Sequence, residues 1–133
     1  MTDLKAKRAA FRALHQQGCF VLPNPWDIGG VRRLEKLGFA ALASTSAGMA
    51  WALGLEDGGV ALDDVLSHLR LLCDSTDLPV NADFEAGFAD DPKEVAANVR
   101  LACDTGVAGL SIEDRTDREL YPLSLAVERI QAS

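Results

Sequence analysis

The chain has 133 residues, of which 48% are hydrophobic and 25% are charged. So much apolar side chain excludes a disordered, collagen-like or mucin-like chain and is enough to build one buried core. The 13 Lys and Arg residues against 20 Asp and Glu residues give a formal net charge of -7. We therefore expect no nucleic-acid partner and no membrane partner, because both present negative charge.

The sequence shows no sign of export or membrane insertion. No apolar run approaches the roughly 20 residues that span a bilayer, and residues 1–10 lack the apolar segment of a signal peptide. The three cysteines, Cys19, Cys73 and Cys103, have no CxxC spacing and lie among apolar neighbours. We expect them to be reduced and buried, and the protein to be cytoplasmic.

The first half of the chain alternates helical and strand-like patterns. A first helix is predicted near Thr2, which can cap it, and it ends at Gly18. The apolar residues 19–22 predict a first, fully buried strand. Asp27 can cap a helix that closes at Gly38. A second strand is predicted over residues 39–43, followed by the polar and small residues 44–48, and a longer loop is predicted to run through residues 51–59.

The second half repeats the same unit. A helix is predicted over residues 62–73, with Asp63 and Asp64 in its first turn, and a third strand over residues 78–82. Asp91 as cap, Pro92 at the first helical position and Glu94 at the third form a strong helix start. A fourth strand is predicted within residues 107–112, and a last helix over residues 123–130.

The predicted strands are continuous apolar runs, which indicates a parallel α/β sheet covered on both faces. Four βα units without a Gly-rich phosphate motif suit a (β/α)8 TIM-type barrel better than a doubly wound sheet. A barrel needs eight units and about 250 residues. The sequence therefore predicts one partial domain over residues 1–133. It is either a half-barrel with a leading helix or an open four-stranded sheet, and a half-barrel leaves its first and fourth strands as unpaired edges.

Polar residues follow each predicted strand: Asn24 after the first, Ser44, Thr45 and Ser46 after the second, Asp83 and Glu85 after the third, and Glu113 and Asp114 after the fourth. The carboxyl ends of parallel strands share one edge, so these side chains are expected to converge. Converging carboxylates repel unless a cation lies between them. Oxygen donors without His or Cys favour Mg²⁺ or Mn²⁺. The alternative is that the same residues are ordinary helix caps and turn residues.

Other chemical signatures are missing. The sequence contains no Ser-His-Asp order, no HExxH and no P-loop. His15 and His68 fall on predicted helices away from the strand ends, and we expect them to serve packing or the surface.

Five segments in order carry a family resemblance: Pro23-Asn24-Pro25-Trp26-Asp27, Ala43-Ser44-Thr45-Ser46-Ala47-Gly48, Leu53-Gly54-Leu55-Glu56-Asp57-Gly58-Gly59, Pro79-Val80-Asn81-Ala82-Asp83-Phe84-Glu85-Ala86-Gly87-Phe88 and Gly109-Leu110-Ser111-Ile112-Glu113-Asp114. Together they resemble the isocitrate lyase/phosphoenolpyruvate mutase superfamily. The resemblance covers nearly the whole chain and corresponds to the N-terminal half of a member.

The resemblance implies a Mg²⁺-dependent (β/α)8 lyase or mutase, homo-oligomeric at full length. Its substrate would be a small 2-oxo or 2-hydroxy carboxylate or a phosphonate, handled through a metal-held enolate-like intermediate. It implies Asp83, Glu113 and Asp57 as catalytic residues and Asp83, Glu85 and Glu113 as metal residues, with Glu113 acting through water. The implied substrate-binding residues are Ser44, Thr45, Ser46, Trp26, Asn24 and Asn81.

Two departures from the family pattern matter. Asn81 stands where members often carry an Asp, which removes one carboxylate from the metal side. Residues 115–122 contain neither the Cys nor the His of the lyase loop, which argues against isocitrate or methylisocitrate cleavage and favours the phosphonomutase-like branch. The alternative is a truncated, inactive half-barrel that acts at most as an oligomerisation or interaction module.

Overall fold

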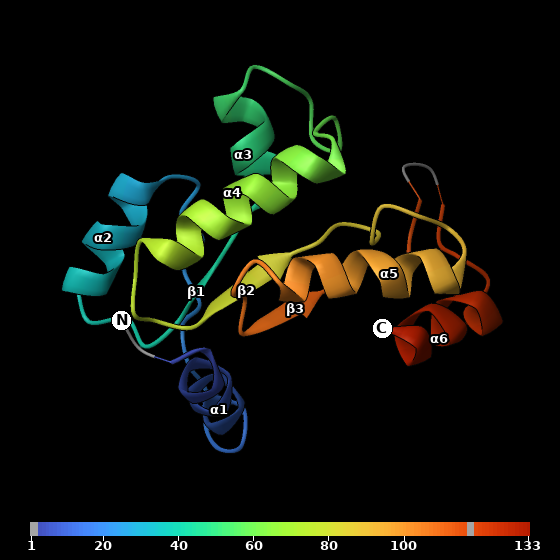
Figure 1. Cartoon of the computed structure of the whole chain (residues 1–133). Helices are drawn as coiled ribbons and strands as arrows, with labels where there is room; N and C mark the ends of the chain where they lie inside the picture. The colour runs from blue at the N-terminus through green and yellow to red at the C-terminus, as the bar shows by residue number, and fades with distance from the viewer. Residues whose placement is uncertain (1–2, 117–118) are drawn as a thin grey trace.

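A computed structural model of the protein describes residues 3–116 and 119–133 (Figure 1). Its elements are α1 (Leu4–Leu14), α2 (Ile28–Lys36), β1 (Leu42–Ala43), α3 (Ser46–Ala52), α4 (Leu62–Asp74), β2 (Val80–Asp83), α5 (Pro92–Cys103), β3 (Gly109–Ser111) and α6 (Leu123–Ala132). The strands form a parallel sheet in the order β1-β2-β3. Helices α4 and α5 make the crossovers between neighbouring strands, so sequential βα units are confirmed.

The predicted helix starts are confirmed where the structure describes them. Asp27 caps α2 by accepting the backbone N–H of Gly30, and Asp91 caps α5 by accepting the N–H groups of Lys93 and Glu94. Both caps satisfy donors that the first turn of a helix leaves unpaired. The predicted cap Thr2 lies outside the described residues.

Two predicted elements were wrong. Residues 19–22 form no strand, so the described sheet has three strands rather than four. Just after these residues, Pro23 O accepts a hydrogen bond from Ala43 N of β1 at 3.0 Å. One such bond is too little pairing to make a β-strand. The short helix α3 (Ser46–Ala52) was not predicted and overlaps the start of the predicted loop 51–59; Thr45 caps it by accepting the N–H of Gly48.

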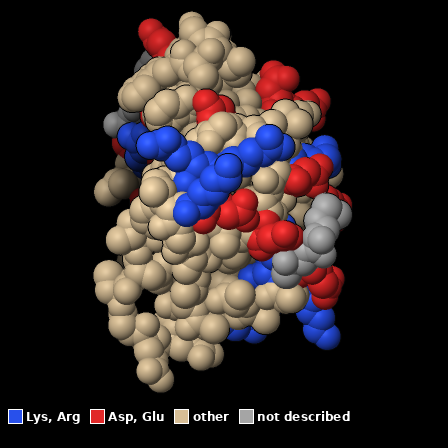
Figure 2. Space-filling view, turned by 90° about the vertical axis from the view of Figure 1, so that its left-hand side faces the viewer, with Lys and Arg blue, Asp and Glu red and all other residues tan. Residues whose placement is uncertain are grey.

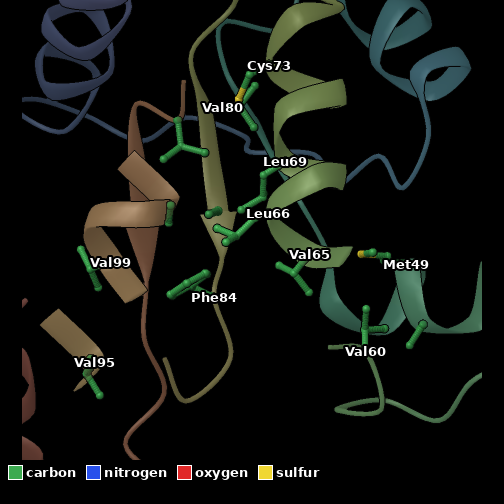
Figure 3. Packing of buried hydrophobic residues seen from close by; sticks show 14 residues of the cluster. Met49, Val60, Val65, Leu66, Leu69, Cys73, Val80, Phe84, Val95 and Val99 are labelled. Atoms are coloured by element: carbon green, nitrogen blue, oxygen red, sulfur yellow. The ribbon is translucent and has the colours of Figure 1, made fainter. Parts of the chain in front are cut away.

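One face of the sheet is covered by helices. Val80, Ala82 and Phe84 are buried against Leu69 of α4 and Val95 of α5 in the main core cluster (Figure 3). Burial alternates along β2, so Asn81 and Asp83 face the other side and are half-buried. Both residues of β1 are buried, so the prediction that both faces are covered holds for β1, whereas β2 and β3 leave residues on the second face partly exposed. In a complete (β/α)8 barrel, the face of the strands that the helices do not cover is the barrel interior.

Helix α1 closes the amino-terminal end of the strands (Figure 1). The buried Lys7 donates to Thr76 O at 2.6 Å and to Cys73 O at 3.4 Å, at the end of α4. Arg8 donates to Cys103 O and Val107 O, at the end of α5. Cys73 and Cys103 lie in the last turns of α4 and α5, where cations suit the negative end of the helix dipole, and Thr76 and Val107 lie just beyond these helices.

The cysteines are free, and they differ in exposure. Cys73 is buried, which raises the pKa of its thiol to about 11. Cys19 is exposed, because the residues around it do not join the sheet, so the prediction of a buried Cys19 was wrong. No helix in the described part of the chain is long and apolar enough to cross a membrane.

Charge is distributed unevenly over the surface. The side of the molecule shown in Figure 2 carries a band of Lys and Arg side chains bordered by Asp and Glu, between broad uncharged areas. Helix α2 presents the exposed residues Arg32, Arg33 and Lys36. The net charge alone did not indicate this local concentration of positive charge.

Candidate functional site

The carboxyl ends of β2 and β3 lie side by side and bring their acidic residues together. Asp83 pairs with Ser111 in the parallel register, and beyond the strands Glu113 N donates to Glu85 O at 2.8 Å. Glu85 and Glu113 then line one small cavity of about 70 Å³, which we call the acidic pocket. Its other lining residues are Asp57, Gly58, Ala86, Arg115 and Thr116. The pocket therefore joins carboxylates from the β2 end, the β3 end and the loop before α4.

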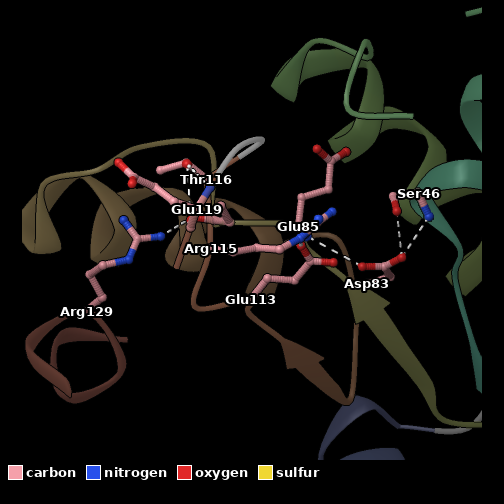
Figure 4. Close-up of polar contacts among 9 residues, drawn as sticks. Ser46, Asp83, Glu85, Glu113, Arg115, Thr116, Glu119 and Arg129 are labelled. Carbon is pink, nitrogen blue, oxygen red and sulfur yellow. Dashed lines mark hydrogen bonds and ion pairs between the residues drawn. The ribbon is translucent and has the colours of Figure 1, made fainter. Parts of the chain in front are cut away.

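Asp83 lies beside the acidic pocket and is held by the segment after β1. Its Oδ2 accepts both the N–H and the hydroxyl of Ser46, each at 2.8 Å (Figure 4). Its own N–H donates to the buried Ser44 Oγ at 2.8 Å. Its Oδ1 accepts from Glu85 N at 3.5 Å. Two of the predicted substrate-binding hydroxyls are thus turned toward Asp83.

The pocket also contains a positive charge that sequence reasoning did not assign to the site. Arg115 Nε lies 2.8 Å from Glu113 Oε2, in an ion pair whose side chains are both about half exposed. Exposed pairs of this kind contribute little to stability. The sequence held one signal for this pair. Arg115 follows Glu113 by two positions, so a turn can bring its side chain back toward the end of the strand.

The remaining predicted substrate residues lie apart from the acidic pocket. Asn24, Trp26 and Thr45 line a second, mostly apolar cavity of about 440 Å³ together with Gly48, Trp51 and Ala52. The two cavities share no lining residue. Asn81 is on β2, where its amide donates to Ala82 O at 3.2 Å.

The donor chemistry of the acidic pocket suits a hard cation, because its acidic residues offer oxygen only. Within residues 3–116 and 119–133, however, no group of three or more His, Cys, Asp or Glu side chains is spaced to hold a metal ion. Asp83 is directed to Ser46 and Glu113 to Arg115. A cation in this pocket would therefore need some of its contacts to pass through water or the side chains to turn.

Comparisons with known proteins agree on one family. The family model of phosphoenolpyruvate phosphomutase matches residues 11–133. The crystal structure of a proposed lyase/mutase from Burkholderia cenocepacia J2315 is 47% identical, with a TM-score of 0.94 over 98% of this chain and 49% of that one. The 2-methylisocitrate lyase of Escherichia coli K12 is 37% identical over 110 residues, or 74% of this chain and 37% of that protein.

A third relative defines the fold. The structure of 2,3-dimethylmalate lyase, a member of the phosphoenolpyruvate mutase/isocitrate lyase superfamily, is 29% identical, with a TM-score of 0.83 over 99% of this chain and 47% of that one. Such structures are TIM-type barrels, so the prediction of part of a (β/α)8 barrel is confirmed. The chain spans about half the length of the relatives it matches.

Proposed function

Because the chain belongs to the phosphoenolpyruvate phosphomutase family, we propose that it carries part of the active site of a Mg²⁺-dependent lyase or mutase. The substrate would be a small 2-oxo or 2-hydroxy carboxylate or a phosphonate. The observation that supports this most directly is the acidic pocket, where Asp57, Glu85 and Glu113 meet from three separate segments. An oxaloacetate acetylhydrolase, 26% identical, has been solved with its product oxalate, which is a ligand of this chemical class.

Asp57, Glu85 and Glu113 are the residues that would hold the ion, with Asp83 adjoining them. When bound, Mg²⁺ supplies a Lewis acid that stabilises negative charge on a substrate oxygen. The neutral Asn81 on β2 offers an amide oxygen in place of a carboxylate. We therefore expect weaker metal binding than a site with one more carboxylate would give.

The protein's own groups have separate tasks in this proposal. Ser44 and Ser46 fix Asp83, so the carboxylate keeps its place as the pocket fills. The guanidinium of Arg115 is the positive side chain of the pocket lining and can bind a carboxylate or phosphonate group of the substrate through paired N–H donors. Binding there would release Glu113 from its ion pair.

The second candidate function is an oligomerisation or interaction module without catalysis. It is favoured by large apolar side chains exposed on and before α6: Leu120, Leu123, Val127 and Ile130. Apolar residues spaced along one exposed helix face commonly mark an interface. Light scattering at several protein concentrations distinguishes a self-associating module from a monomer.

The proposed metal site is tested by calorimetric titration of the 133-residue chain with Mg²⁺, and then with oxalate in the presence of Mg²⁺. We expect Mg²⁺ to bind and Glu113→Gln to weaken its affinity by about tenfold or more, in the range seen for lost metal-site partners. Glu128→Gln on α6 is the control, because Glu128 lies outside the acidic pocket lining. No metal-dependent heat, or equal affinities in both variants, would contradict the proposal.

A further inference from the structure

Arg129 is the largest fully buried side chain in the described part of the chain, with 1% of its surface exposed. It lies on α6, which packs against α5. A buried guanidinium is costly unless its donors and its charge are satisfied. The contacts of Arg129 therefore indicate what this residue does in the structure.

Within the described part of the chain, the hydrogen bonds of its guanidinium go to the segment that follows β2. The guanidinium donates to the carbonyl groups of Ala86, Ala89 and Asp90, the last at 2.9 Å. The ring of Tyr121 lies 4.1 Å from its central carbon and adds a cation–π contact. Among the described residues, no carboxylate lies within ion-pair distance of Arg129. Its charge is thus neutralised mainly by the backbone dipoles of one segment.

That segment has an unusual backbone. Glu85 and Phe88 have φ values of 47° and 59°, a left-handed conformation that non-glycine residues rarely adopt. Gly87 is also left-handed, and a Cβ there would lie 3.0 Å from Val95. Such conformations persist when surrounding contacts hold them. Asn98 of α5 donates to Gly87 O, and Arg129 donates to three further backbone carbonyl groups of the segment.

The held segment also builds the acidic pocket. Glu85 is its first left-handed residue, and both Glu85 and Ala86 line the pocket. Glu85 O accepts the N–H of Glu113, so the position of Glu85 also sets where the β3 end lies. Figure 4 shows Arg129 at the left of the view, with Glu85 and Glu113 well to its right. A side chain on α6 is thereby linked mechanically to two carboxylates that it does not touch.

We propose that Arg129 is a positioning residue: by binding the carbonyl groups of residues 86, 89 and 90, it holds Glu85, and through it Glu113, in the geometry of the acidic pocket. The metal-binding part of this inference rests on the proposed function. The backbone part does not, because the position of the segment can be measured without any ligand.

The experiment compares Arg129→Met and Arg129→Lys with Lys7→Met. Lys7 is a matched control, because it is also a buried cation that donates to backbone carbonyls, but at the opposite end of the strands. Two readouts are measured: Mg²⁺ affinity by calorimetry, and hydrogen exchange at the amides of Gly87 and Glu113. These amides bond to Phe84 O and Glu85 O, each at 2.8 Å, and so report on the segment directly.

We expect Arg129→Met to exchange faster at Gly87 and Glu113 and to bind Mg²⁺ about tenfold more weakly, and Arg129→Lys to show smaller changes in the same direction. Lys retains the charge but cannot reach three carbonyls as the planar guanidinium does, so Arg129→Lys should rescue only part of the loss. Lys7→Met should leave both readouts unchanged while still lowering stability. If Arg129→Met fails to fold, Arg129→Lys carries the test.

Unchanged exchange at Gly87 and Glu113 in the Arg129 variants would overturn the positioning role. The same holds if Lys7→Met accelerates both amides equally, since the effect would then be one of general stability. If the unsubstituted chain binds no Mg²⁺, the proposed function fails, and the exchange measurement still decides the role of Arg129.

Discussion

The carboxylate of Asp83 accepts both donor groups of Ser46, so one acidic residue joins the end of β2 to the start of α3. Ser44 strengthens the same connection by accepting the Asp83 N–H. These residues were predicted from sequence as separate metal and substrate groups. In the structure they form one hydrogen-bonded unit beside the acidic pocket, so substitution of either serine would also move Asp83.

His68 on α4 is the residue for which we expect a pH effect on stability. Burial lowers the pKa of His68, and the nearby Asp27 opposes this in part. Its Nε2 is buried, and among the described residues it has no hydrogen-bond partner. The unfolded chain, where the pKa is about 6.5, therefore binds a proton more readily than the folded chain does.

The sign follows from this difference in proton binding. The free energy of unfolding should be highest above pH about 6.5 and fall as the pH drops through that value toward the lower folded pKa. Urea unfolding between about pH 5 and 8, the range around this window, should show that the free energy of unfolding of the native chain depends on pH. Part of this dependence should be lost in His68→Leu. His15→Gln serves as the comparison. An unchanged slope in His68→Leu would refute the assignment.

At the scale of elements, capping explains which helices could be predicted. The Asp91, Pro92 and Glu94 pattern is local, and it begins α5 where the sequence indicated. Helix α3 also has a capping residue, Thr45, but it follows a strand of two residues, and no helix was predicted for it from the sequence. Seven residues are too few for a clear periodicity, so tertiary contacts decide its state.

The cap at Asp91 can be tested alone. Its Oδ1 accepts from Lys93 N at 2.8 Å and from Glu94 N at 3.3 Å. We expect Asp91→Ala to lower the free energy of unfolding by about 1 kcal/mol, because two helix N–H groups lose their acceptor. Asp91→Asn should retain most of the stability, since an amide oxygen can also cap. Equal losses in the two variants by urea unfolding would show that the cap is not the cause.

At the scale of the whole molecule, α1 connects βα units that are distant in sequence. Lys7 binds the end of α4 and Arg8 binds the end of α5, so one helix turn joins residues 73–76 to residues 103–107. Phe11 of the same helix is buried next to Gly109, where an added Cβ would lie 2.6 Å from its ring. The leading helix is therefore part of the core of this half-barrel.

Removal of the Lys7 contacts should destabilise the entire domain. We expect Lys7→Met to lower the free energy of unfolding by about 2 kcal/mol, because buried carbonyl acceptors lose a charged donor. Lys5→Met changes an exposed residue on the same helix and should cost much less. A single cooperative urea transition at lower midpoint is the expected observation. A selective loss of α1 with the rest intact would mean that the helix is an appendage.

Much about this protein follows from the sequence alone, because the signals are local. Helix caps at Asp27 and Asp91, apolar strand segments around Leu42 and Val80, and acidic residues directly after β2 and β3 predicted the βα units and the edge where carboxylates gather. The ordered motifs were also sufficient to indicate the family that the comparisons show.

The tertiary structure decided what depends on contacts between distant residues. Sequence could not show that Ser46 binds Asp83, that Trp26 lies in a separate cavity, or that Arg129 holds the backbone beside Glu85. The apolar residues 19–22 were also predicted to form a strand that the structure does not contain, because a strand requires a neighbour with matching hydrogen bonds. Side-chain direction and pairing are set by packing across the whole chain, and composition and spacing do not encode them locally.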